Sequence, residues 1–94
     1  MITGDQIRAA RAILGWSAEE AAARGATTRQ TIQRLEQHKG VPPSRSATLV
    51  DLQSAFEAAG VEFVGTADEG PGVRLWASKA QTAPMKKARA RKST

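Results

Sequence analysis

Two short helices joined by a tight turn are predicted for residues 17–36, and this segment constrains the fold of the whole chain. Ser17 stands three residues before Glu20, which is the spacing of a capping box at a helix start. Gly25 can adopt positive φ and is expected to end that helix, and Thr28 is a good N-cap for the next one. The predicted helices span about residues 18–24 and 28–37.

Another helix is predicted before this segment. Thr3 and Gln6 also have capping-box spacing, in which the threonine oxygen accepts a backbone N–H and the glutamine reaches back. Trp16, directly before the next N-cap, is expected to pack back on the helices as a core or staple residue. Apolar residues recur at helical spacing at Ile7, Ala10, Ile13 and Leu14. The predicted helix spans about residues 4–14.

A loop and a fourth helix are predicted after residue 37. The double proline Pro42-Pro43 cannot lie within a helix, so the segment that contains it is a loop. Ser46 is the expected N-cap of the fourth helix, and Gly60 is its expected end. This helix is predicted over about residues 47–59.

Residues 61–76 change to the alternating pattern of a β-hairpin. Strands are predicted over about residues 61–64 and 73–76, around a flexible turn, in the register that pairs Phe63 with Val73. A two-stranded hairpin is marginal in water, so it must pack on the helices or add to the strands of a partner, which would make a homodimer. The side chains assigned to this core or dimer contact are Phe56, Val61, Phe63, Val73, Leu75 and Trp76.

Charge is distributed unevenly along the chain. The formal net charge is +5, yet residues 78–94 contain six Lys/Arg and no Asp or Glu, and residues 1–77 contain eight and nine. The last segment has almost nothing apolar to bury, so a disordered basic tail is predicted over residues 78–94 after one domain over residues 1–77. Within that domain, the stretch from Arg24 to Arg45 holds five cations against Glu36 alone. One region of a nearly neutral body is therefore selectively positive.

The predicted helix over residues 28–37 has a polar face with the chemistry of base recognition. Ile32 and Leu35 are expected to point inward, which leaves arginine and glutamine side chains on the other side. Arginine matches guanine O6 and N7, and glutamine matches adenine N6 and N7, in the major groove. A plain solvated face is the alternative interpretation. The candidate base-reading residues are Arg29, Gln30, Gln33 and Arg34, and Lys39 and Arg45 in the following loop are candidate phosphate contacts.

The chain resembles the Cro/phage-repressor (Xre-like) helix-turn-helix family over residues 2–76. The resemblance is carried by residues 7–17, by Glu20 and Ala22, by residues 28–36, and by a later part that is similar to a bacterial branch ending in strands. It implies a mainly α, four-helix, lambda-repressor-like DNA-binding domain with a C-terminal β-hairpin. It also implies phosphate contacts at Ser17, Thr28 and Thr31, and a structural pair between Arg11 and Glu36.

The chain departs from the family's pattern at three positions. Ala18 stands where glutamine is common, and Ala21 stands where leucine is usual, which leaves a smaller core. The turn usually ends in glycine, but here Gly25 precedes Ala26. Either Gly25 makes the turn with an altered geometry, or Ala26 takes a left-handed conformation at a cost of about 1 kcal/mol.

These features favour a cytoplasmic, nucleoid-associated regulator, expected to be a repressor that binds a palindromic DNA operator as a homodimer. An antitoxin that binds a toxin and represses its own operon is the alternative, and a sequence-indifferent DNA binder is third. With no cysteine and with His38 as the one histidine, we expect no enzyme, metal or cofactor. No apolar run or signal-peptide pattern indicates a membrane protein or an exported one.

Overall fold

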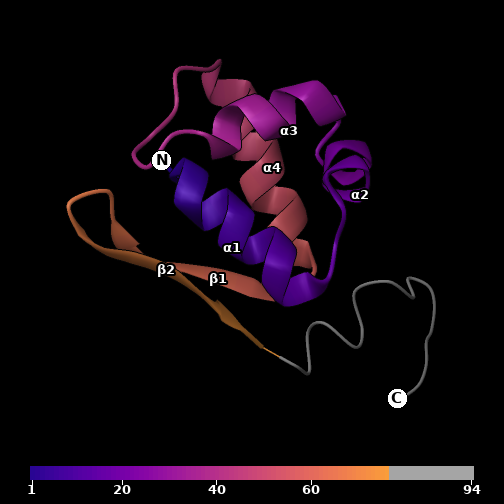
Figure 1. The fold of residues 1–94 in the computed structure, drawn as a ribbon. Coiled ribbons are helices and arrows are strands. Elements are labelled where there is room, and N and C mark those ends of the chain that lie inside the picture. The colour runs from indigo at the N-terminus through magenta and orange to yellow at the C-terminus, as the bar shows by residue number, and fades with distance from the viewer. Residues whose placement is uncertain (77–94) are drawn as a thin grey trace.

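The structure, a computed structural model, describes residues 1–76, in which four helices are followed by a two-stranded antiparallel sheet (Figure 1). The chain is therefore mainly helical, as the sequence predicts. The predicted tail over residues 78–94 lies outside the described residues. The elements are α1 (Gly4–Leu14), α2 (Ala18–Arg24), α3 (Arg29–Glu36), α4 (Ser46–Ala58), β1 (Val61–Thr66) and β2 (Glu69–Leu75).

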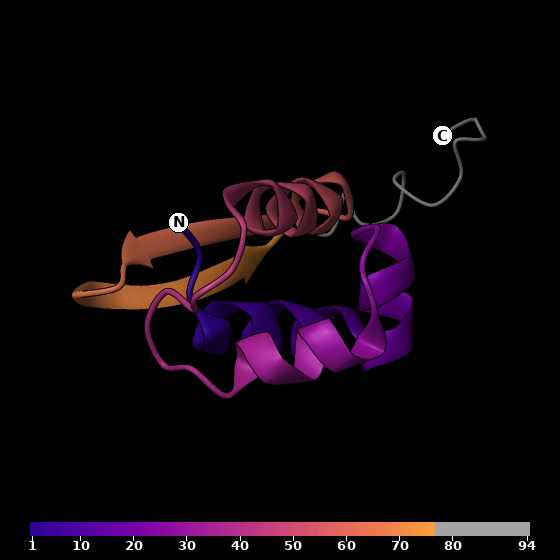
Figure 2. The ribbon, with the colours of Figure 1, turned by 90° about the horizontal axis from the view of Figure 1, so that it is seen from above.

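The elements form two layers (Figure 2). Helices α1 and α3 run side by side in one layer, and α4 lies beside β1 in the other. Helix α2 closes one end of the molecule, and the hairpin extends beyond the other end. This arrangement leaves one long side of α3 uncovered.

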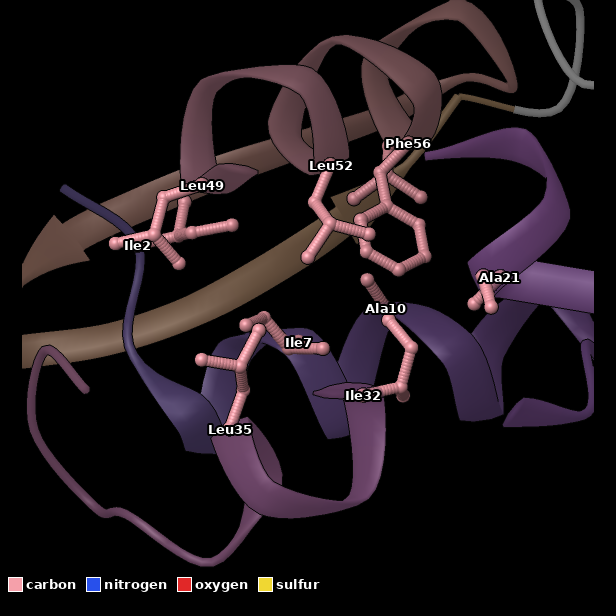
Figure 3. Close-up of a cluster of buried hydrophobic side chains, with 11 residues drawn as sticks. Ile2, Ile7, Ala10, Ala21, Ile32, Leu35, Leu49, Leu52 and Phe56 are labelled. Carbon is pink, nitrogen blue, oxygen red and sulfur yellow. The ribbon is translucent and has the colours of Figure 1, made fainter. Parts of the chain in front are cut away.

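The core lies between the two layers and is filled from every helix. Figure 3 shows Ile7 of α1 and Leu35 of α3 facing Leu52 and Phe56 of α4. Phe56 is fully buried, and its ring centroid lies 5.4 Å from that of Trp16 and 6.0 Å from that of Phe63. Trp16 is therefore a core-packing residue, as predicted.

Ile13 was predicted on the inner face of α1 but lies outside this core. Its side chain is 43% exposed, whereas Ile7 and Ala10 are fully buried. Leu14 is half-buried against the core. Helix α3 and strand β2 cover the side of α1 that carries Ile7, and Ile13 lies outside that covered side.

The turn between α2 and α3 resolves the question of Gly25 and Ala26. Gly25 is the C-cap of α2, as predicted, with φ −93°, and Ala26 has φ 56°, so the second of the two expected geometries is the one that the turn adopts. Gly25 is needed for a different reason, because a Cβ built on it would lie 2.4 Å from Cδ2 of Leu52. Close packing of α4 thus requires glycine at position 25, and the left-handed conformation falls on Ala26.

The start of α4 differs by one residue from the prediction. Arg45 is the N-cap, without a side-chain capping bond, and Ser46 is the first helical residue. The carbonyl of Arg45 accepts the N–H groups of Thr48 at 3.1 Å and Leu49 at 3.3 Å. The helix therefore begins one residue earlier than predicted. Ser46 lies inside the first turn, so its hydroxyl is not at the N-cap position. The predicted end at Gly60 is replaced by a C-cap at Ala59.

The hairpin has the predicted register but longer strands. Phe63 pairs with Val73, Val61 with Leu75 and Glu62 with Arg74. Pairing continues to Thr66 and Glu69 past a register shift at Gly65, which has φ 77°. A Cβ on Gly65 would lie 2.3 Å from the carbonyl oxygen of Gly70. A glycine bulge therefore replaces most of the flexible turn that the sequence led us to expect.

Gln6 connects α1 to the hairpin. Its backbone N–H and side-chain oxygen complete the capping box with Thr3. Its Nε2 also donates to the carbonyl oxygens of Val64 at 2.9 Å and Gly72 at 3.0 Å. One buried side chain thus both caps a helix and holds both strands.

Candidate nucleic-acid interface

Helix α3 lies at the upper side of the ribbon in Figure 1, and its polar side chains are exposed to solvent. The Thr28 hydroxyl oxygen accepts the N–H of Thr31 at 3.1 Å, so Thr28 is the predicted N-cap. Ile32 and Leu35 are fully buried. This anchoring fixes the rotation of the helix about its axis and turns the opposite side outward. The exposed side chains there are Arg29, Gln30, Gln33 and Arg34.

Ion pairing separates the cations into two groups. Within residues 1–76, the ion pairs occupy the arginines at positions 8, 11, 24 and 74. The remaining cationic side chains of these residues form no ion pair there, and all of them lie in α3 or in the segment after it. They are Arg29, Arg34, Lys39 and Arg45, all exposed. Positive charge available to an external anion is therefore concentrated in one continuous segment.

Arg11 and Glu36 form the pair that the family resemblance implies. Nε and Nη2 of Arg11 donate to the two carboxylate oxygens of Glu36 at 2.8 and 2.9 Å, and Nη1 donates to the carbonyl of Trp16 at 3.2 Å. The hydrogen bond to Glu36 raises the pKa of Arg11 above its ordinary value, against the opposing effect of burial. The pair ties α1 to the end of α3 and neutralises the one carboxylate on α3.

The three hydroxyl residues assigned to phosphate contact have unequal surroundings. The Ser17 hydroxyl is exposed and accepts the N–H of Glu20 at 3.0 Å, which leaves its own proton free to donate. The Thr28 hydroxyl donates to that of Thr31 at 3.0 Å. Ser17 also stands beside the acidic first turn of α2, although Arg24 pairs with Glu20 there. Thr28 and Thr31 therefore lie in a less acidic setting than Ser17.

Arg34 makes a contact that the sequence did not predict. Its Nη1 donates to the carbonyl oxygen of Pro43 at 2.9 Å. The guanidinium of a predicted base reader is thus directed toward the loop between α3 and α4. No sequence signal marks this contact, because it depends on how the loop returns along the helix.

The six side chains assigned to a core or dimer contact fall into three environments. Phe56 and Val61 are buried within one chain and serve its core. Phe63, Val73 and Leu75 are half-buried and pack against that core. Trp76 is 46% exposed, with its Nε1 donating to Glu62 at 2.8 Å and the guanidinium of Arg74 lying 5.7 Å from its ring centroid. Trp76 is the member of this group with most surface left for a partner.

Among residues 1–76, no group of three or more His, Cys, Asp and Glu side chains could hold a metal ion. In the same part of the chain, no helix is long and apolar enough to cross a membrane.

Neither a scan against models of known protein families nor a search of curated proteins found a match to this chain. The functional argument therefore rests on the side chains of α3 and of the loop that follows it.

Proposed function

We propose that the protein is a sequence-specific, double-stranded DNA-binding transcriptional regulator of the Cro/phage-repressor type. In this proposal α2, the turn and α3 act as a helix-turn-helix, and α3 enters the major groove. The observation that carries the proposal is the confinement of the unpaired cations of residues 1–76 to α3 and the segment after it. Cations that served only solubility would not need to be confined to one segment of the domain.

The composition of the α3 face supports reading of bases rather than general attraction to phosphate. Arg29 can donate two hydrogen bonds to guanine, and Gln30 and Gln33 can each pair with the edge of adenine. Arg29 and Gln30 stand in the first turn of α3, which is the end that meets base edges when such a helix docks. Sequence preference would thus come from a few side chains, with Lys39 and Arg45 adding affinity through the backbone.

A homodimer on a palindromic operator completes the proposal. Two copies would place their α3 helices about one helical turn of DNA apart, roughly 34 Å. The exposed ring of Trp76 and the edges of a two-stranded sheet support self-association through the hairpin. Occupation of a promoter by such a dimer would repress transcription in the cytoplasm.

Selection of bound DNA from a random duplex pool tests the proposal. We expect one enriched motif with two-fold symmetry, and half-site centres separated by about one turn. Arg29→Ala should lose the preference at one base pair, whereas Arg8→Ala, which removes the same charge from an exposed pair on α1, should keep the motif. A pool that stays random after selection with the intact protein contradicts sequence-specific binding.

The antitoxin alternative is favoured by one observation, the exposed Trp76 and Arg74 at the end of the hairpin. Tryptophan and arginine are enriched among residues that dominate protein–protein binding energy. A toxin would bind there while α3 represses the shared operon. Co-expression with the product of an adjacent reading frame tests this: a stable complex that Trp76→Ala dissociates supports it, and a complex unchanged by that substitution removes the basis for it.

A further inference from the structure

Arg34 lies in the last turn of α3, and its guanidinium contacts the loop over residues 37–45. The bond from Nη1 to the carbonyl of Pro43 is 2.9 Å long. Among the hydrogen bonds within residues 1–76, it is the one made by a side chain to a residue of this loop. The other loop contacts use backbone groups.

Those backbone contacts hold the first half of the loop and, at its other end, Arg45, whose carbonyl accepts the N–H groups of Thr48 and Leu49 at the start of α4. The N–H of His38 donates to the carbonyl of Leu35 at 3.2 Å, and the carbonyl of Gly40 accepts the N–H of Gly4 at 3.0 Å. A Cβ on Gly4 would lie 2.0 Å from the carbonyl oxygen of His38, so α1 presses directly against this stretch. Between Gly40 and the start of α4, Arg34 supplies the hydrogen-bonded attachment.

The second half of the loop carries one of the two cations proposed to touch phosphates, and the first half carries the other. Lys39 lies just before the Gly40 attachment, and Arg45 is the N-cap of α4, two residues after Pro43. The contact with Pro43 therefore bears on where the backbone before Arg45 runs relative to α3. A freely moving segment would have to be ordered on binding, at a cost in conformational entropy for every residue fixed.

We propose that Arg34 is a positioning residue that holds the second half of this loop, residues 41–45, against α3, so that Arg45 meets a phosphate beside the groove while the backbone contacts hold Lys39. Base reading then falls to Arg29, Gln30 and Gln33. This inference rests on the proposed DNA-binding function and reverses the role that the sequence assigned to Arg34.

A double-mutant cycle on the full chain tests the proposal. Binding to the selected operator and to a duplex of shuffled sequence is measured by fluorescence anisotropy between about 50 and 200 mM NaCl. Over this range, affinity that depends on phosphate contacts falls strongly. The proteins are wild type, Arg34→Ala, the double variant Lys39→Ala/Arg45→Ala, and the triple variant. Arg29→Ala serves as the base-reading comparison, Arg8→Ala as the matched charge control, and thermal unfolding checks that each variant is folded.

If Arg34 acts through the loop, Arg34→Ala lowers affinity for both duplexes by the same factor. It also reduces the slope of log affinity against log salt by about one. In the Lys39→Ala/Arg45→Ala background the same substitution has a further effect of less than about twofold, because the residues act as a unit. Arg29→Ala instead loses about 5- to 150-fold on the operator and much less on the shuffled duplex.

Two results would overturn this inference and leave the proposed DNA-binding function intact. One is a change in the preferred base at one position in Arg34→Ala, which would make Arg34 a base reader. The other is a full, additive loss in the triple variant, which would separate Arg34 from the loop cations. Wild-type protein that binds both duplexes equally overturns the proposed function and this inference with it.

Backbone ¹⁵N relaxation of the protein without DNA gives a second measure. Arg34→Ala should lower the order parameters of the Ser44 and Arg45 amides while leaving those of α1 unchanged, because only the attachment at Pro43 is lost. Unchanged order parameters at Ser44 and Arg45 would mean that the loop holds its position without Arg34, and would contradict the proposal whatever the DNA binding shows.

Discussion

At the residue scale, side chains that hold α3 in place are distinct from those that it offers to a partner. Arg11 and Glu36 are mostly shielded, with side chains 27% and 11% exposed, and they fix one end of the helix. Arg29, Gln30 and Gln33 are exposed. Stability and the proposed recognition of DNA therefore depend on different side chains around the same short helix.

Removing one partner of the Arg11–Glu36 pair should destabilise the fold. Arg11→Ala leaves the Glu36 carboxylate largely buried without its two donors, so we expect a loss of about 2 kcal/mol in the free energy of unfolding. Urea denaturation measures it. Arg8→Ala breaks an exposed pair and should cost less than about 1 kcal/mol. Equal losses in the two variants would mean that the Arg11–Glu36 pair contributes no more than an exposed one.

Ala26→Gly should stabilise the protein. Ala26 has φ 56°, a conformation that costs an L-residue about 1 kcal/mol and costs glycine nothing, although part of the gain is lost through greater freedom of the unfolded chain. We expect a rise in the midpoint of thermal unfolding. Ala23→Gly, the same change at an exposed position inside α2, should lower it. A lower midpoint for Ala26→Gly would contradict strain at this turn.

At the scale of elements, local signals were sufficient for the helices and tertiary contacts decided the exceptions. Caps at Thr3, Ser17 and Thr28 and the apolar periodicity predicted all four helices to within one residue at each end. Cross-strand pairing predicted the hairpin register. These features depend on residues close in sequence or on a regular period.

The contacts that the sequence did not predict concern residues whose surroundings come from distant parts of the chain. Gly25 is required by Leu52 of α4 rather than by its own φ, and Gln6 of α1 holds strands more than fifty residues away. At the candidate site, the exposed face of α3 followed from its period, whereas the contact of Arg34 with Pro43 depended on the path of the loop. The pattern of residue types along the sequence does not specify the path of a loop or which distant residues come into contact.

Gln6→Ala should loosen the hairpin selectively. It removes the donor that bridges the carbonyls of Val64 and Gly72, and leaving buried polar groups with fewer partners costs about 1–3 kcal/mol. We expect faster amide exchange in β1 and β2, with smaller changes in α3. Gln53→Ala, which loses an exposed hydrogen bond to Glu57, is the control. Uniformly faster exchange throughout the protein would show that Gln6 supports the whole core and not the hairpin in particular.

At the scale of the whole molecule, the proposed function gives separate roles to the charge of the domain and to that of the last residues. Residues 1–77 are nearly neutral, with their unpaired cations gathered on α3 and its loop, whereas residues 78–94 carry six Lys/Arg and no acid. Specificity should therefore belong to the domain, and the last residues should add attraction to phosphates of any sequence.

Removal of residues 78–94 tests that division of roles. We expect the shortened protein to bind every duplex more weakly and with a shallower salt dependence, because fewer phosphates are neutralised. Its ratio of operator to shuffled-duplex affinity should stay the same, since Arg29, Gln30 and Gln33 are intact. Anisotropy titrations at several salt concentrations measure both quantities. A ratio that falls to one would mean that recognition does not belong to α3, and a sequence-indifferent DNA binder would then explain the chain better.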